Sequence, residues 1–204
     1  MGNLVLYVHG AGGTAAEAEH YAPFFVGSDV IGFDYKSKNL WDAKNEFANF
    51  FSSLDKKYKS VTIIANSIGA FFVMHALANE RIERAIFISP IVNMEKIITD
   101  MMKFSNVTED ELRDKKEIAT ERGENLSWKY LCYVRENPIA WKIPTHILYG
   151  AKDNLTSMET MTNFARKIGA TLTIMENGEH WFHTTEQMKF LDGWLKKIVE
   201  RKIL

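Results

Sequence analysis

The sequence predicts an α/β fold, a three-layer sandwich in which a mostly parallel, twisted, six-stranded sheet carries helices on both faces. Two observations support this prediction. Short apolar, β-branched runs alternate with longer segments of helical periodicity. No internal repeat or low-complexity stretch interrupts the chain. Such alternation is typical of a parallel sheet, because each parallel strand needs a crossover connection, usually a helix, to return to the starting edge.

The predicted strands are short runs rich in Val, Ile, Leu and aromatic residues, which suits strands buried on both faces. They cover residues 4–8, 29–35, 61–65, 82–88, 145–149 and 171–175. Helices are expected between them over residues 14–25, 40–57, 68–78 and 157–168. A final amphipathic helix places on one face Met188, Leu191, Trp194, Leu195, Ile198 and Val199.

Residues 93–142 break this alternation, because they are charged and helical and show no strand pattern. Thr108-Glu109-Asp110-Glu111 matches a capping box, and Ser127 is placed to cap a further helix. We therefore expect a single domain over residues 1–204 with a small helical cap, or lid, inserted at 93–142. The alternative is a second helical layer without a functional role.

Apolar and aromatic side chains of this insert have two possible roles: they line a pocket for an acyl chain, or they form core where the insert meets the sheet. They are Ile97, Met101, Met102, Phe104, Trp128, Tyr130 and Tyr133. The sequence alone favours neither role.

Composition and net charge limit the classes of partner that the protein is expected to bind. The 204 residues are 46% hydrophobic and 25% charged, ordinary for a soluble globular protein. The formal net charge of −1 creates no field that would attract nucleic acid or an anionic membrane, so neither is expected as a partner. No apolar run approaches the roughly 18 residues of a spanning helix, and the N-terminus shows no secretory signal. Cys132, the only cysteine, is expected to be a buried thiol, and the protein to be cytoplasmic.

Ser67 stands where a buried strand turns sharply into an apolar helix. Small residues flank it at the second position on each side, Ala65 before and Gly69 after. Only small side chains fit there when the serine occupies the apex of so tight a turn, as in the G-x-S-x-G nucleophile elbow. A helix N-cap serine is the alternative interpretation of this pentapeptide.

The other predicted strand ends decide between these interpretations, because sites in parallel α/β sheets form at the carboxyl ends of the strands. The turn Gly10-Ala11-Gly12-Gly13 follows the first strand, and Asp153 follows the strand over 145–149. His180 follows the last strand. A serine, an acid and a histidine are therefore expected at one edge of one sheet.

These residues resemble the motifs of the α/β-hydrolases over nearly the whole chain. The motif residues are His9-Gly10 with its following glycines, Ala65-Asn66-Ser67-Ile68-Gly69, Gly150-Ala151-Lys152-Asp153 and Gly178-Glu179-His180-Trp181-Phe182. The insert resembles the variable cap of that family. Ala65 in place of glycine is a mild departure, and the leading antiparallel strands of the family have no room before Leu4. The resemblance thus implies a minimal member that lacks those strands.

The resemblance and the chemistry of serine catalysis together imply a catalytic role for each of these residues. A serine hydroxyl is a weak nucleophile and needs an adjacent base, which would be His180. Asp153 would hold the imidazole tautomer and stabilise the imidazolium. The backbone N–H groups of Ala11 and Ile68 would form the oxyanion hole. No cofactor and no metal is expected.

Each assignment has an alternative. Asp34, also at a strand end, is the rival acid, and His183 is the rival base. Glu179, His180 and His183 could suggest a metal site, but no partner cluster accompanies them. His9 is interpreted as structural, orienting the oxyanion loop.

Two other classes of protein compete with a hydrolase. Gly10-Ala11-Gly12-Gly13-Thr14-Ala15 satisfies G-x-G-x-x-A, and Asp34 lies where a ribose-binding acid would stand, as in a dinucleotide binder. That interpretation leaves Ser67, Asp153 and His180 unexplained. A non-catalytic protein of the same fold, which binds a ligand or partner, is the second alternative.

The sequence says less about the substrate. A short chain with a modest insert and little net charge favours a small, mostly apolar acyl ester or thioester. A peptidase, a lipase and a carbon–carbon bond hydrolase remain open, because the fold does not choose among these chemistries. The protein is expected to be a monomer or a homodimer.

Overall fold

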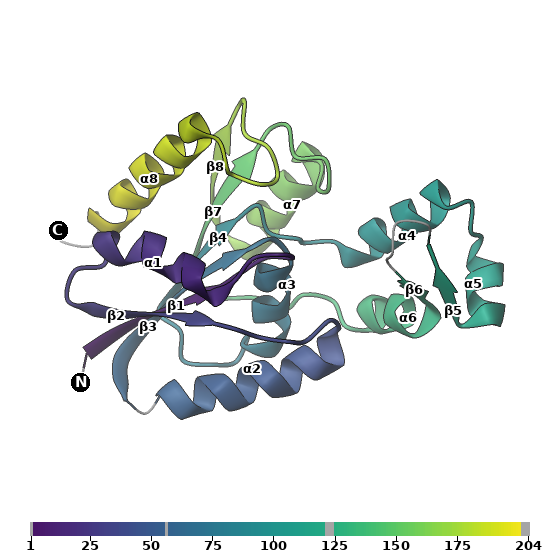
Figure 1. The fold of residues 1–204 in the computed structure, drawn as a ribbon, viewed down its shortest axis with the longest axis horizontal. Helices are drawn as coiled ribbons and strands as arrows, with labels where there is room; N and C mark the ends of the chain where they lie inside the picture. Colours follow the sequence, from purple (N-terminus) through teal and green to yellow (C-terminus); the bar gives the residue numbers. More distant parts are fainter. Residues whose placement is uncertain (1, 56, 121–124, 201–204) are drawn as a thin grey trace. The chain divides into compact units, whose positions relative to one another are not determined.

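A computed structural model describes residues 2–55, 57–120 and 125–200. Its contacts divide the chain into two compact units (Figure 1). The first unit comprises Met1–Val92 and Ala140–Leu204, and the second comprises Asn93–Ile139. Among the described residues, no helix is both long and apolar enough to cross a bilayer.

The first unit is built on a six-stranded sheet with the order β2-β1-β3-β4-β7-β8. Its strands are β1 (Gly2–Val8), β2 (Ser28–Phe33), β3 (Tyr58–Asn66), β4 (Arg84–Ile88), β7 (Thr145–Gly150) and β8 (Thr171–Met175). Every neighbouring pair is parallel, so all carboxyl ends lie at the same edge (Figure 1). The predicted fold class is confirmed.

Helices cover the two faces of this sheet because its strands are apolar on both sides. On one face, α1 (Ala18–Tyr21) and α8 (Thr185–Glu200) pack over a core that includes Val5, Ile64, Ile86 and Leu148. On the other face, α2 (Leu40–Asp55) and α3 (Ser67–Ala76) meet through an edge contact of Phe47 with Phe72. A further helix of this unit, α7 (Met158–Ile168), ends at Gly169, which adopts the left-handed conformation.

One helix predicted in the first unit is not continuous in the structure. The continuous helix expected over residues 14–25 is three short segments: a 3₁₀ turn at Ala15–Glu17, α1, and a second 3₁₀ turn at Ala22–Phe24. Pro23 lies inside the last segment. Proline has no N–H and its ring clashes with the preceding turn, so the α-helix ends before it.

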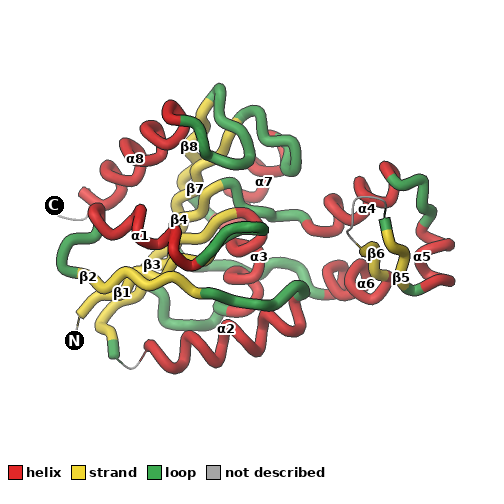
Figure 2. The backbone as a smooth tube through the Cα atoms, in the orientation of Figure 1, coloured by secondary structure: helices red, strands yellow, loops and turns green. Residues whose placement is uncertain are grey.

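The second unit contains the helices α4 (Met94–Phe104), α5 (Glu109–Lys115) and α6 (Trp128–Glu136). It also contains the strands β5 (Glu117–Ala119) and β6 (Asn125–Ser127), which pair antiparallel (Figure 2). The insert therefore has helices, as expected, together with a short strand pair for which the sequence shows no pattern. Three-residue strands are too short to show an alternating pattern, and they form here because Lys116, with a φ of 68°, turns the chain out of α5.

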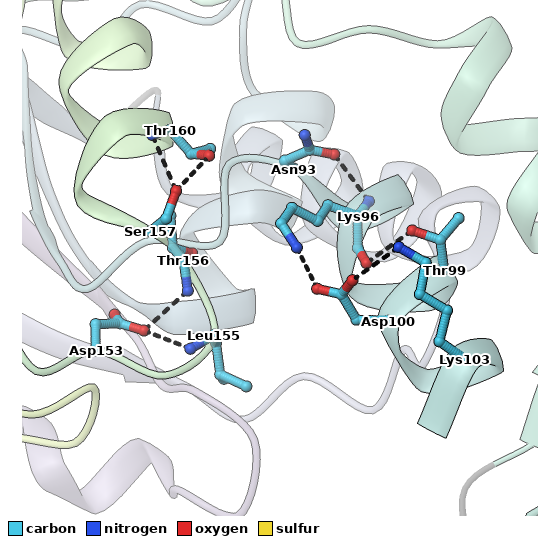
Figure 3. Close-up of polar contacts among 10 residues, drawn as sticks. All are labelled: Asn93, Lys96, Thr99, Asp100, Lys103, Asp153, Leu155, Thr156, Ser157 and Thr160. Carbon is cyan, nitrogen blue, oxygen red and sulfur yellow. Dashed lines mark hydrogen bonds and ion pairs between the residues drawn. The ribbon is translucent and has the colours of Figure 1, made fainter. Parts of the chain in front are cut away.

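Caps fix where the helices of the second unit begin. Asn93 caps α4 by accepting a hydrogen bond from the Lys96 N–H at 2.9 Å (Figure 3). The capping box predicted at Thr108 is confirmed, since Thr108 and Glu111 bond reciprocally. Ser127 caps α6, as predicted, by accepting from the Tyr130 N–H at 3.4 Å.

Arg135 ties the three helices of this unit together. From α6 its guanidinium bonds Glu95 of α4 at 2.7 Å and both carboxylate oxygens of Glu109 of α5 at 2.7 and 2.9 Å.

Of the side chains proposed to line an acyl pocket, Met102 is buried and Phe104 is 66% exposed. The others are half-buried. Both the pocket and the lid stay predictions.

Candidate active site

Ser67 occupies a strained turn at the junction of β3 and α3. Its φ of 50° lies in the left-handed region, which costs a non-glycine residue free energy and persists only when the surroundings enforce it. The surroundings are tight: a Cβ added at Gly69 would lie 2.2 Å from the carbonyl oxygen of His9. Ala65, in place of the usual glycine, is fully buried and fits its position. The geometry is that of a nucleophile elbow.

The glycine turn after β1 passes beside this serine. A Cβ added at Gly10 would lie 3.1 Å from the Cβ of Ser67, so the turn and the elbow are in direct contact. Ala11 is the next residue along this turn. On the other side of the serine, Ile68 lies in the first turn of α3. N–H groups in a first turn have no partner within the helix, which leaves them available for an anion.

Three side chains from three strand ends form one hydrogen-bonded chain. The Ser67 hydroxyl lies 2.8 Å from Nε2 of His180. Nδ1 of His180 lies 2.7 Å from Oδ2 of Asp153. The Asp153 side chain is fully buried, whereas that of His180 is 15% exposed. The structure therefore brings together the serine, histidine and acid that the sequence singled out.

The loop after β7 holds the Asp153 carboxylate in place. Its second oxygen, Oδ1, accepts the backbone N–H groups of Leu155 at 2.8 Å and Thr156 at 3.0 Å (Figure 3). Both oxygens are thus occupied, which compensates for the complete burial of the charge. A carboxylate acceptor at Nδ1 requires that nitrogen to carry the proton, so a neutral His180 leaves Nε2 free to accept the serine proton.

The loop that carries the acid is packed directly against the loop that carries the histidine. A Cβ added at Gly150 would lie 2.4 Å from the carbonyl carbon of Gly178. The Lys152 N–H donates to the Gly178 carbonyl at 2.8 Å. Glycine at both positions allows this close approach, and the approach sets the spacing between Asp153 and His180.

The alternative residues lie elsewhere. Asp34 is exposed and pairs with Lys36 at 2.7 Å, and that pairing lowers the pKa of its carboxyl. His183 is exposed, stacks on Trp181 and bonds the Trp181 carbonyl at 2.8 Å. In the described part of the chain, no group of three or more His, Cys, Asp or Glu side chains is arranged to hold a metal ion.

His9 is buried under the glycine turn. Its Nδ1 donates to the Gly10 carbonyl at 2.8 Å, and its ring stacks on Tyr35 with centroids 4.4 Å apart. The Tyr35 hydroxyl in turn donates to the His9 carbonyl at 3.1 Å. These contacts are those expected of a residue that shapes the turn.

A second polar network beside the serine was not predicted. The Asn66 amide donates to the Tyr7 hydroxyl at 3.0 Å, and that hydroxyl donates to Glu17. Glu17 also accepts the Thr14 N–H at 2.9 Å, at the end of the glycine turn. Burial, the neighbouring Tyr21 and Glu17 raise the pKa of Tyr7 far above its ordinary value, so the phenol stays protonated. The network joins the residue before Ser67 to the glycine turn.

One sequence signal could have pointed to this network. Thr14-x-x-Glu17 has the spacing of a capping box, in which a glutamate reaches back to the first N–H of a helix. The contribution of Tyr7 carries no such signal, because a tyrosine in a buried strand is ordinary core.

Comparison with known proteins supports the fold. No protein-family model and no curated protein matches the chain. Among solved structures, Est1E from Butyrivibrio proteoclasticus matches with a TM-score of 0.77 and 16% identity, covering 98% of this chain and 88% of that one. Mouse alpha/beta hydrolase domain-containing protein 10 matches with a TM-score of 0.74 and 16% identity, and the match covers 97% of this chain and 90% of that one. An esterase from Pyrococcus furiosus matches with a TM-score of 0.61 and 18% identity, and the match covers 97% of this chain and 80% of that one.

Because these sequence identities are low, the structural similarity establishes the fold alone. The chain has the α/β-hydrolase fold, as its motifs predict.

Proposed function

We propose that this protein is a serine hydrolase that cleaves a small carboxylic ester or thioester through Ser67, His180 and Asp153. The observation that carries the proposal is the hydrogen-bonded chain from the serine hydroxyl through both imidazole nitrogens to a buried carboxylate. A binding protein has no need for that alignment, whereas covalent catalysis by serine depends on it.

In the first half of the reaction, Ser67 Oγ attacks the acyl carbon while His180 Nε2 takes the hydroxyl proton. The negative charge that develops on the carbonyl oxygen is stabilised by the N–H groups of Ile68 and Ala11. The tetrahedral intermediate collapses, the bond to the alcohol or thiol breaks, and His180 returns the proton to that leaving group. The product of this half is an acyl ester on Ser67.

In the second half, a water molecule attacks the acyl carbon and gives a proton to His180. The bond between the acyl group and Ser67 breaks, Ser67 recovers its proton from His180, and the carboxylic acid leaves. Asp153 stays ionised throughout and stabilises the imidazolium formed in both halves.

The substrate class rests on the small size of the chain and on the structural neighbours. One of those neighbours is named as an esterase, and one solved structure is described as ferulic acid bound to Est1E. We propose by analogy that this chain acts on small esters or thioesters.

Turnover of p-nitrophenyl esters and acyl thioesters of increasing chain length tests the activity. Wild type should release product, and the Ser67→Ala variant should not. Ser89→Ala is a matched control, because Ser89 also directly follows a central strand, has a positive φ of 43° and is buried. Equal turnover by wild type and Ser67→Ala would contradict the proposal.

A further inference from the structure

A cavity of about 600 Å³ lies at the other end of the sheet, in the first unit. It is formed by the amino ends of β4, β7 and β8 and by one side of α8. Its volume falls within the range of about 300 to 1,000 Å³ that is usual for small-molecule sites. Ser67, Asp153 and His180 stand at the carboxyl ends of their strands, and none of them lines this cavity.

The sheet face beneath α8 changes character along its strands. Side chains on one face of a strand recur every second residue. Ile86, Leu148 and Met175 belong to the apolar core of this face. Two residues earlier on each strand, the same face carries Arg84, His146 and Thr173, which line the cavity. This end of the face therefore offers polar and charged side chains to the cavity, of the kind that orient a ligand in a small-molecule site.

Arg84 is the half-buried charge at this end. Its Nη1 donates to the Ile198 carbonyl at 3.3 Å and its Nε to Thr62 Oγ1 at 3.4 Å, both long bonds. Among the residues that the structure describes, no carboxylate lies within 4.0 Å of its guanidinium. Burial lowers the pKa of Arg84, and the charge of Glu83 partly offsets this. The guanidinium therefore retains capacity for a bidentate anion.

The charge of the lining favours an anion. Among the described residues that line the cavity, Arg84, Lys189 and Lys197 are cationic and only Glu83 carries a carboxylate. Two aromatic side chains of α8, Trp194 and Phe190, form another part of the wall. Trp194 is fixed by a hydrogen bond from its Nε1 to Thr173 Oγ1 at 3.0 Å. Cationic groups beside an aromatic wall suit a ligand with an anionic head and a flat apolar body.

Gly193 keeps room for such a ligand. It lies inside α8, where glycine costs about 1 kcal/mol relative to alanine. Close packing does not require it, because a Cβ added there would meet nothing within 4 Å. Gly193 lines the cavity, and a larger side chain at this position would occupy it.

We propose that this cavity is a binding site for a small organic carboxylate with an aromatic body. The carboxylate faces Arg84, and the ring lies against Trp194 and Phe190. The inference does not rest on the proposed hydrolase activity, because it uses none of the residues of that site.

Isothermal titration with 1-naphthoate, and with the neutral 1-naphthalenemethanol for comparison, tests the proposal on the full chain. Wild type should bind the carboxylate at least tenfold more tightly than the alcohol. Arg84→Gln should weaken carboxylate binding at least tenfold and remove the preference over the alcohol. Arg81→Gln is the matched control, because Arg81 is exposed, lies close in sequence and does not line the cavity.

Gly193→Leu tests the location of the site. The leucine should weaken binding of both probes at least tenfold, whereas Lys196→Gln on the same helix, outside the lining, should not. If Arg84→Gln fails to fold, the double variant Lys189→Gln with Lys197→Gln replaces it, because both lysines are exposed. That variant should weaken carboxylate binding severalfold and leave alcohol binding unchanged.

Three results would overturn the proposal: no binding of the carboxylate to wild type, equal binding of carboxylate and alcohol, or full binding to folded Gly193→Leu. A carboxylate could instead bind at Ser67 as a reaction product does. Naphthoate binding that is lost on Ser67→Trp but kept in Gly193→Leu would place the ligand there. Binding kept in Ser67→Trp and lost in Gly193→Leu supports the cavity, whether or not the protein hydrolyses esters.

Discussion

The two ends of the sheet differ in how firmly their main charged side chains, Asp153 and Arg84, are held by hydrogen bonds. At the carboxyl end, both oxygens of Asp153 and both nitrogens of His180 have partners. The backbone there is so crowded that Gly69 has no room for a methyl group. At the amino end, Arg84 makes only long hydrogen bonds, and Gly193 faces open space.

The difference fits the functions that we propose for the two ends. Catalysis by a serine needs groups that are already in place, because reorganisation during the reaction would add to the barrier. The hydrogen bonds that hold Asp153 and His180 and the close packing at Gly69 provide this. Binding a separate molecule needs the opposite, unfilled space and unused hydrogen-bonding capacity. Substitutions at the carboxyl end should therefore abolish chemistry or folding, and those at the amino end should be tolerated.

The largest effect is expected at the serine and its base. Ser67→Ala and His180→Ala should each lower ester turnover by about 10⁶-fold, and the double variant should lose little more, because the residues act as a unit. The measurement is kcat for an activated ester. His183→Ala serves as control and should keep most activity. If His183→Ala loses activity and His180→Ala keeps it, His183 and not His180 is the base.

The acid should matter less but still strongly. Asp153→Asn keeps the shape of the side chain yet favours the wrong imidazole tautomer, and we expect kcat to fall by about 10⁴-fold. Asp34→Asn is the matched control, since Asp34 is exposed and paired with Lys36. A greater loss of kcat in Asp34→Asn than in Asp153→Asn would show that the hydrogen bond to His180 is not the functional one.

Crowding at the elbow should appear as lost stability. In Gly69→Ala the new methyl group would meet the His9 carbonyl at 2.2 Å, so the backbone has to move. We expect the free energy of unfolding to fall by about 3 kcal/mol or more, as for other strained core substitutions. Urea denaturation measures this loss. An unchanged denaturation midpoint would mean that the strand and the helix pass less closely than described.

The far end of α3 should respond to pH without affecting the chemistry. Burial, with a smaller contribution from Lys44, lowers the pKa of His75 to about 4. The unfolded chain has an ordinary histidine pKa of about 6.5, so it binds a proton that the folded protein excludes between these values. Stability should therefore fall as pH drops from about 6.5 to about 4, by at most about 3 kcal/mol.

Urea denaturation across this pH range, compared with His75→Gln, isolates the effect of the buried imidazole. The variant should lose that part of the pH dependence. His183→Gln is the control for the replacement of a histidine as such, because the His183 side chain is 41% exposed. An identical slope in wild type and His75→Gln would show that His75 titrates normally.

The smallest effect is a gain in stability. Gly193→Ala should stabilise the protein by about 1 kcal/mol, because alanine is the better helix former and its methyl group meets nothing. Thermal and urea unfolding measure the change. Destabilisation by alanine would reveal a close contact at Gly193 and remove the contrast with Gly69.

Much of this architecture follows from local sequence patterns. Buried parallel strands appear as continuous apolar runs, and the carboxyl ends of such strands meet at one edge. For that reason Ser67, Asp153 and His180 could be expected near one another before any coordinates were known. The hydrogen bonds confirm their proximity, while their catalytic roles stay predictions.

The features that the sequence did not predict depend on contacts between distant segments or on very short elements. The β5–β6 pair has only three residues in each strand, too few to show periodicity. The bond of Tyr7 to Glu17 joins a core strand to a turn, and neither residue is unusual in its own segment. The cavity at Arg84 gathers residues from three strands and a helix, and no motif marks such an assembly.

The most direct test of the central claim, that Ser67 is an activated nucleophile, is intact mass after treatment with a fluorophosphonate. Such a reagent forms a stable adduct only with a serine that has a functioning base and oxyanion hole. The account predicts one adduct on wild type, one on Ser89→Ala and none on Ser67→Ala. A folded wild type that stays unmodified, or an adduct that persists in Ser67→Ala, would contradict it.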